Sequence, residues 1–281
     1  MAATVGSSWA RDLAAVAYVA GDLVVVSPIT LPVPATLLTV GPINSASDTA
    51  PIPYASTIPV VGAGAGTEGV LDLDLTTAVD SLDIASDVDG AEGSRSAIGN
   101  ITLTDASATL GVIGLVDILT LNLDTTTALV SNSSVTWDGA TLTPVGTSNF
   151  ITSGAVLNLN ILGVNVVLPA LAANASVPFT VDVSALGLRV QGDVSIRVDA
   201  VDILTGGDTA SANTISVLFS TELSVTSALG TALDLNTTVA LNQSSAQLTA
   251  VPVPEPGVST GVMLAAAGLL MRRGRRRSGA A

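Results

Sequence analysis

The sequence contains no cysteine, no histidine and no lysine among its 281 residues. These absences exclude disulfide bonds, thiolate and Schiff-base chemistry, histidine-dependent triads and ordinary zinc sites. The lack of cysteine gives no sign of an oxidising compartment, although it does not argue against one. Carboxylates are the groups that remain for acid–base chemistry.

Aromatic residues are also scarce: the chain has two Trp, two Tyr and three Phe. A glycosidase needs two facing carboxylates, usually in a cleft where aromatic rings stack on the sugars. The dispersed aromatic residues disfavour such a cleft, and Asp72 and Asp74 are better interpreted as the solvated face of a strand. We therefore expect a protein that is not an enzyme. A secreted carbohydrate-active enzyme that uses paired aspartates is the alternative.

Positive charge is nearly absent from the body of the chain. Residues 1–256 hold four arginines and 23 acidic residues, a net charge of −19. A surface this acidic repels nucleic acid and anionic membranes, so we expect no nucleic-acid partner. Acidic polymers, such as an extracellular polysaccharide, would be bound only through bridging cations. With 48% hydrophobic residues, the chain is too apolar to be disordered.

The main pattern along the chain is a two-residue alternation of apolar and polar side chains. It is seen in Val70–Leu75, Leu119–Asp124, Leu157–Ile161, Val194–Asp199 and Leu233–Asn236. This period is that of strands with one buried face, and Gly-containing pairs such as Gly192-Asp193 and Gly206-Gly207 indicate turns between them. A sandwich, a barrel and a β-solenoid all fit. Because similar segments recur without a fixed period, we favour an antiparallel β-sandwich-like body over residues 67–250.

The first 66 residues differ from that body. An apolar stretch is followed by repeated prolines and by Gly62-Ala63-Gly64-Ala65-Gly66, which predicts irregular loop or edge-strand material for residues 27–66. The start is a poor secretory signal, because Arg11 is closely followed by Asp12 and because Asp22 interrupts the apolar run. Either the true start lies upstream or Ala14–Val26 serves as an unusual signal; we favour the first interpretation.

The last thirty residues carry the clearest motif. Val253, Pro254, Glu255 and Pro256 belong to a proline-rich spacer of residues 251–256, and an uncharged apolar segment, Gly257–Met271, follows directly. Residues 272–281 then contain a basic cluster of Arg272, Arg273, Arg275, Arg276 and Arg277. The apolar segment can satisfy its own backbone as a helix in lipid, and the arginines would keep the C-terminus cytoplasmic.

This order of elements resembles the PEP-CTERM sorting signal of Gram-negative-type bacteria. The resemblance covers residues 251–277, and it implies recognition and cleavage by a membrane-embedded exosortase. It also implies a body released to the cell surface or the extracellular matrix, a setting associated with biofilm. The apolar segment has 15 residues, which is short for a permanent anchor but sufficient for a transient signal. A plain C-terminal anchor and a tail without a membrane role are the alternatives.

One acidic cluster is a candidate cation site. Asp83, Asp87, Asp89 and Glu92 surround the pair Asp89-Gly90, and calcium prefers several carboxylate and carbonyl oxygens. The spacing does not match the helical calcium loop, so a solvated turn is the competing interpretation. Asp199, Asp202 and Asp208 form a second candidate. Taken together, the sequence predicts a secreted structural or adhesive all-β protein with a C-terminal sorting helix.

Overall fold

The computed structural model describes residues 8–26, 36–40, 45–48, 54–68, 71–86, 95–112, 116–138, 141–227 and 232–252. These residues form two antiparallel sheets of seven strands each, with one short helix, α1 (Phe150–Ser153). Sheet A has the order β11-β12-β13-β14-β1-β2, with β3 also paired to β1. Sheet B has the order β10-β9-β7-β6-β5-β4, with β8 also paired to β7. The prediction of an all-β protein with antiparallel sheets is confirmed.

The strands of sheet A are β1 (Ser8–Val26), β2 (Thr36–Val40), β3 (Ser45–Asp48), β11 (Ser176–Ala185), β12 (Leu188–Gly206), β13 (Thr209–Ser227) and β14 (Ala232–Pro252). Those of sheet B are β4 (Tyr54–Glu68), β5 (Leu71–Ser86), β6 (Arg95–Val112), β7 (Val116–Trp137), β8 (Leu142–Ser148), β9 (Val156–Ile161) and β10 (Val164–Val166).

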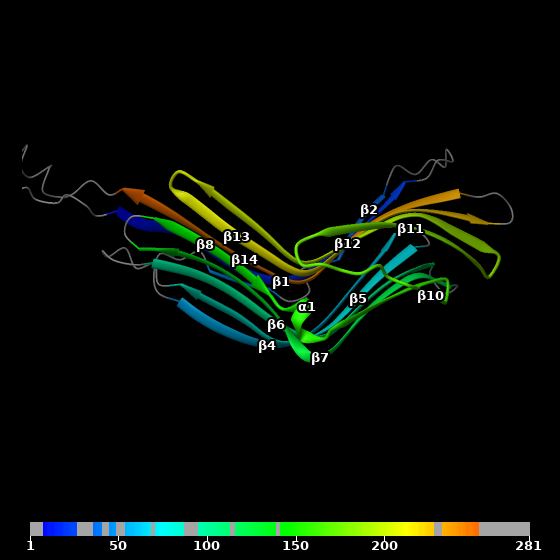
Figure 1. Cartoon of the computed structure of the whole chain (residues 1–281), viewed down its shortest axis with the longest axis horizontal. Coiled ribbons are helices and arrows are strands. Elements are labelled where there is room, and N and C mark those ends of the chain that lie inside the picture. Colours follow the sequence, from blue (N-terminus) through cyan, green and yellow to red (C-terminus); the bar gives the residue numbers. More distant parts are fainter. Residues whose placement is uncertain are drawn as a thin grey trace, which may run out of the picture.

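The two sheets stack face to face, with β14 over β6 and β7 and with β13 over β7 and β8 (Figure 1). The alternation read from the sequence sets which side chains lie between them. Leu121 and Leu123 are fully buried, whereas Asn122 and Asp124 between and beside them are exposed. Each strand therefore buries one apolar face and presents hydroxyl, amide and carboxylate groups to water.

The sheets begin earlier in the chain than residue 67, where the sequence placed the start of the body. β1 pairs with β14 from Ser8↔Pro252 to Val26↔Asp234, and β4 pairs with β5. The apolar residues of β1 form a strand between two others of sheet A, and the Gly-Ala segment expected as loop or edge material belongs to an edge strand. Residues 253–281, with the expected helix, lie outside the described residues.

One predicted turn is wrong. Gly192-Asp193 lies inside β12, and Gly192 stands opposite Leu223 of β13. Gly192 has φ 150°, and a Cβ there would collide with the backbone oxygen of Glu222. This glycine therefore allows close approach of two strands, which is the other common reason for glycine in a strand. Gly206-Gly207 does form the predicted turn, since β12 ends at Gly206 and β13 begins at Thr209.

Both sheets bend sharply in the middle, so the molecule has the outline of an open V with α1 at the bend (Figure 1). The irregularities in strand pairing of both sheets lie at this bend. In sheet A, Asp199, Ser216 and Asn242 drop out of the pairing, and Asp199 and Asn242 have φ of 46° and 59°. In sheet B, the β6–β7 register shifts between Leu103 and Asp105, opposite residues 125–128 of β7. Aspartate and asparagine tolerate this left-handed conformation better than most residues.

The bend divides the interior into two arms. The leucine-rich arm contains β9, β10 and β11 and the nearer halves of the long strands, with Leu121, Phe219 and Leu241 fully buried. The serine-rich arm contains β8 and the other halves, and its interior includes Ser131, Ser133, Thr214 and Ser244. A small separate apolar cluster closes its far end: Ala97, Val135, Trp137, Ala210, Ala246 and Leu248.

Candidate functional site

The outer face of sheet A in the leucine-rich arm carries an open depression that polar groups line. This face of the sheet is on the inner side of the V (Figure 1). Two adjoining hollows of about 460 and 530 Å³ share Asp193, Glu222 and Asn236. Both are open to solvent and neither is an enclosed cavity. We call this surface the concave hollow.

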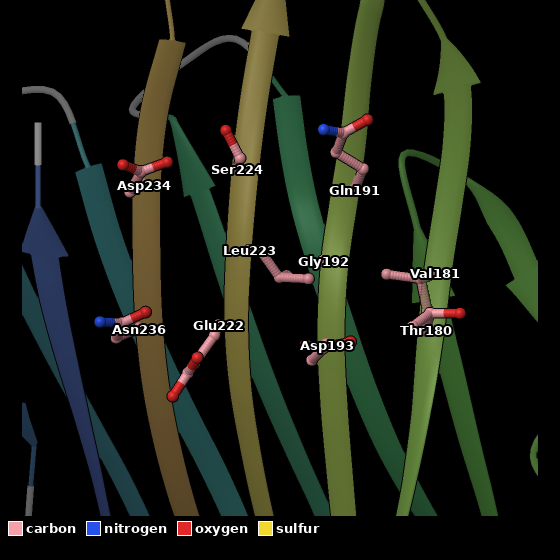
Figure 2. A pocket seen from close by; sticks show the side chains of 10 residues that line it. All are labelled: Thr180, Val181, Gln191, Gly192, Asp193, Glu222, Leu223, Ser224, Asp234 and Asn236. Carbon is pink, nitrogen blue, oxygen red and sulfur yellow. The ribbon is translucent and has the colours of Figure 1, made fainter. Parts of the chain in front are cut away.

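The strand register brings these side chains together from distant parts of the chain. Thr180 of β11 pairs with Asp193 of β12, Asp193 with Glu222 of β13, and Glu222 with Asn236 of β14. The neighbouring row is Asp182, Gln191, Ser224 and Asp234. Figure 2 shows the residues that line the first hollow spread over four adjacent strands, with the Leu223 side chain pointing toward Gly192.

The hollow is acidic, and its carboxylates are free. Asp193, Glu222 and Asp234 neither accept a hydrogen bond from another described residue nor pair with a described arginine. Asp193 and Glu222 stand directly opposite each other, an arrangement of like charges that disfavours the pairing of two strands. None of the described residues that line the two hollows is aromatic. The surface can accept hydrogen bonds from hydroxyl or amino groups and can donate them from Gln191 and Asn236.

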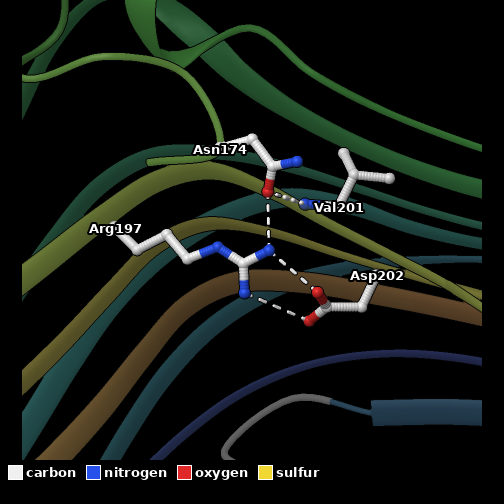
Figure 3. Close-up of polar contacts among 4 residues, drawn as sticks. All are labelled: Asn174, Arg197, Val201 and Asp202. Carbon is white, nitrogen blue, oxygen red and sulfur yellow. Dashed lines mark hydrogen bonds and ion pairs between the residues drawn. The ribbon is translucent and has the colours of Figure 1, made fainter. Parts of the chain in front are cut away.

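The arginines of β12 lie outside the hollow and are both engaged. Arg189 makes two hydrogen bonds to Asp182, of 2.8 and 2.7 Å, and its guanidinium lowers the pKa of the Asp182 carboxyl. Arg197 binds Asp202 and also donates to the Asn174 side-chain oxygen at 2.6 Å, which in turn accepts from the Val201 amide (Figure 3). This second network links Asn174, in the segment between β10 and β11, to β12.

A second acidic row lies on the outer face of sheet B. Asp72 of β5 and Asp117 of β7 flank Gly111 of β6, and each places one carboxylate oxygen 3.2 Å from where a Gly111 Cβ would stand. Partial burial, together with repulsion from Asp74 and Asp117, raises the pKa of Asp72. Asp72 and Asp74 are thus on the solvated face of a strand, as expected, and their repulsion is a local cost of this arrangement.

The candidate calcium loop is described only at its first member. Asp83 lies in β5, where one carboxylate oxygen accepts from Asn100 at 3.2 Å and from Ser81 at 3.4 Å. Asp87, Asp89 and Glu92 lie outside the described residues. Calcium binding there stays a prediction, and a calorimetric titration with calcium would test it.

The second candidate set does not come together. Asp199 is buried, and its carboxylate accepts the amides of Phe150 at 2.7 Å and Ile151 at 3.0 Å at the start of α1. Asp202 is paired with Arg197, and Asp208 lies in the turn between β12 and β13. The prediction of a shared cation site is therefore wrong. Across the described ranges, no three Asp or Glu side chains are grouped closely enough to hold a metal ion.

The sorting motif, the apolar segment 257–271 and the arginine cluster lie outside the described residues. Within the described part, the structure has no helix of the length and apolarity needed to cross a membrane. No family model, no curated protein and no solved structure matches this chain.

Proposed function

We propose that this chain is a secreted or cell-surface structural and adhesive protein of the extracellular matrix. In this proposal, its C-terminal sorting signal is processed by an exosortase. The observation that carries the proposal is the order of three elements in residues 251–277: Pro254-Glu255-Pro256, an apolar segment and five arginines. The precursor is inserted in the membrane with its C-terminus cytoplasmic, because moving each arginine across costs about 2.5–3.5 kcal/mol.

The body is compatible with this role. Its outer strand faces carry small hydroxyl, amide and carboxylate groups, a wet surface suited to many weak polar contacts. The concave hollow supports an adhesive role, because its free acceptors can bind hydroxyl-rich or amine-bearing polymers. An extracellular polysaccharide without negative charge is the partner that this surface favours, since like charge repels acidic polymers.

The alternative function is a secreted carbohydrate-active enzyme that uses paired aspartates; in the concave hollow the carboxylate that stands opposite Asp193 is that of Glu222. The hollow is open, and no aromatic ring lines it, so the features that hold and distort a sugar are missing from this surface. The double variant Asp193→Asn, Glu222→Gln separates the two functions. An enzyme would lose hydrolysis of a polysaccharide, whereas an adhesive surface would change only binding.

The sorting tail is tested by replacing Pro254, Glu255 and Pro256 with alanine. This variant should stay in the membrane at full length, whereas the Glu92→Ala control, which removes the same charge elsewhere, should be released. Mass spectrometry of the exported protein should find no peptide from residues 272–277. Exported protein that still contains those arginines would overturn processing and leave a plain anchor.

A further inference from the structure

The inference concerns β4, the strand at one edge of sheet B. In the described part of the chain β4 pairs only with β5, from Tyr54↔Ser86 to Glu68↔Leu71. Its other side therefore presents a row of backbone N–H and C=O groups that no described strand pairs. Such an edge is a template for another strand, and proteins usually protect it with short strands, charges, prolines or bulges.

The other edges of the two sheets show these protections. β2, β3 and β10 contain five, four and three residues. β8 has seven residues and includes Pro144. β11 includes Pro178, which lacks an N–H, and it carries the ion pair between Asp182 and Arg189.

β4 is different along most of its length. It has 15 residues, and its one irregularity is a register shift between Ile58 and Val60, at Pro59. From Val60 to Thr67 the strand contains no proline and no charged residue, although the whole chain has a net charge of −14. As far as the described residues show, this half of β4 is a long edge without a short strand length, a charge, a proline or a bulge to protect it.

The sequence of this half also suits pairing with itself. Gly62-Ala63-Gly64-Ala65-Gly66 reads the same in both directions. Two antiparallel copies related by a two-fold axis at Gly64 would therefore place Gly62 opposite Gly66 and Ala63 opposite Ala65. A two-fold interface requires such self-complementarity, and the absence of charge means that no like charges meet across it.

We propose that β4 is an assembly edge: a second copy of this chain pairs its own β4 with it in antiparallel fashion. The two copies of sheet B then form one continuous sheet across the two-fold axis at Gly64. The inference concerns association of the body and does not depend on how the tail is processed.

Because the chain lacks cysteine, a single introduced cysteine reports this contact without background. At the two-fold axis, Gly64→Cys would face its own copy at a Cα separation of roughly 4.5–5.5 Å, within the range that a disulfide spans. Thr180→Cys, an exposed position on the protected edge strand β11, is the matched control. With the full chain in detergent under mild oxidation, the Gly64→Cys dimer should form at least about tenfold faster than the control dimer, because pairing raises the effective concentration.

A second variant keeps the test decisive if cysteine at position 64 prevents folding. Ala65 stands opposite Asp74 of β5, so Ala65→Lys gains an opposite charge within its own sheet but places positive charge on the pairing edge. Its melting temperature should be unchanged, while analytical ultracentrifugation should show the dimer of the full chain weakened at least about tenfold. A full chain that sediments as a monomer at all concentrations, or an Ala65→Lys variant that associates as strongly as the original, would overturn the proposal. Neither result bears on cleavage at Pro254-Glu255-Pro256, so the two proposals fail separately.

Discussion

The two arms of the V share the same long strands but have different interiors. In the leucine-rich arm, branched and aromatic side chains such as Leu121, Phe219 and Leu241 separate the sheets. In the serine-rich arm, the sheets are joined by hydroxyl groups. The Ser133 hydroxyl lies 2.9 Å from both the Thr214 hydroxyl and the Ser244 backbone oxygen, and the Ser131 hydroxyl donates to the Thr214 backbone oxygen at 3.0 Å.

This difference shows two ways of filling the space between sheets. Large apolar side chains gain free energy by leaving water, in proportion to the area they bury. Short hydroxyl side chains bury little apolar area, but their hydrogen bonds to the facing backbone satisfy polar groups that would otherwise be costly inside. The first interior should be sensitive to loss of volume, and the second to added volume.

The largest effect is expected for Phe219→Ala in the leucine-rich arm. Phe219 is completely buried, so its removal leaves a cavity and should lower the free energy of unfolding by about 3–5 kcal/mol. Chemical denaturation measures this loss. Phe219→Leu, which keeps most of the volume, is the control and should lose much less. An equal loss for both variants would mean that volume does not govern this arm.

The complementary test adds one methyl group to the serine-rich arm. A Cβ at Gly146 of β8 would collide with the Thr214 hydroxyl and lie 2.6 Å from a methyl carbon of Val201. Gly146→Ala should therefore destabilise the protein by about 1–3 kcal/mol, since overpacked cores must shift. Gly206→Ala is the matched control, because nothing lies within 4 Å of its Cβ position. Equal melting temperatures of the two variants would contradict the close packing of this arm.

Two threonines interrupt the apolar interior of the leucine-rich arm, and replacing them sharpens the comparison. Thr221 and Thr237 stand opposite each other on β13 and β14, both buried, and neither hydroxyl has a partner in the described structure. Thr237→Val replaces an unsatisfied hydroxyl with a methyl group and should stabilise the protein by about 1 kcal/mol. Ser133→Ala, which removes a satisfied hydroxyl from the other arm, should do the opposite. A destabilised Thr237→Val would show that its hydroxyl is bonded in solution.

The smallest effect concerns pH and the outer face of sheet B. Burial and repulsion raise the pKa of Asp72, so the folded state holds this proton more tightly than the unfolded chain does. Asp72 therefore increases the free energy of unfolding as pH falls through the raised pKa, and this contribution is lost as pH rises. Asp72→Asn should slightly raise the melting temperature at pH 7 and flatten this slope. Asp234→Asn removes the same charge from the outer face of sheet A and provides the comparison.

The sequence was sufficient to predict the sheets but not the bend. Leu73 and Leu75 are buried and alternate with Asp72 and Asp74, so local alternation alone identified β5 and its faces. The bend depends on Asp199 and Asn242 in the left-handed conformation, and in sequence both look like ordinary polar strand residues. The nearest signal in the sequence comes one residue later, where Ala200 and Val201 are two apolar residues in a row and the alternation fails.

The concave hollow was missed for a related reason. Asp193, Glu222 and Asn236 belong to three different strands, and each occupies an outward position where polar residues are the default. Only the register between strands shows that they share one row. The sequence predicts a turn at Gly192-Asp193 because glycine beside aspartate is common in turns, while the role of glycine inside a strand depends on the partner strand.

The position of β14 has a mechanical consequence. This strand pairs with β13 on one side and β1 on the other over most of its 21 residues, and it ends at Pro252, so the first two residues of the predicted spacer, Val251 and Pro252, belong to the strand. A pull transmitted through that spacer runs along the strand axis and loads two hydrogen-bonded ladders at once in shear, so that many bonds must break together. β14 is thereby held by hydrogen bonds on both flanks against such a pull.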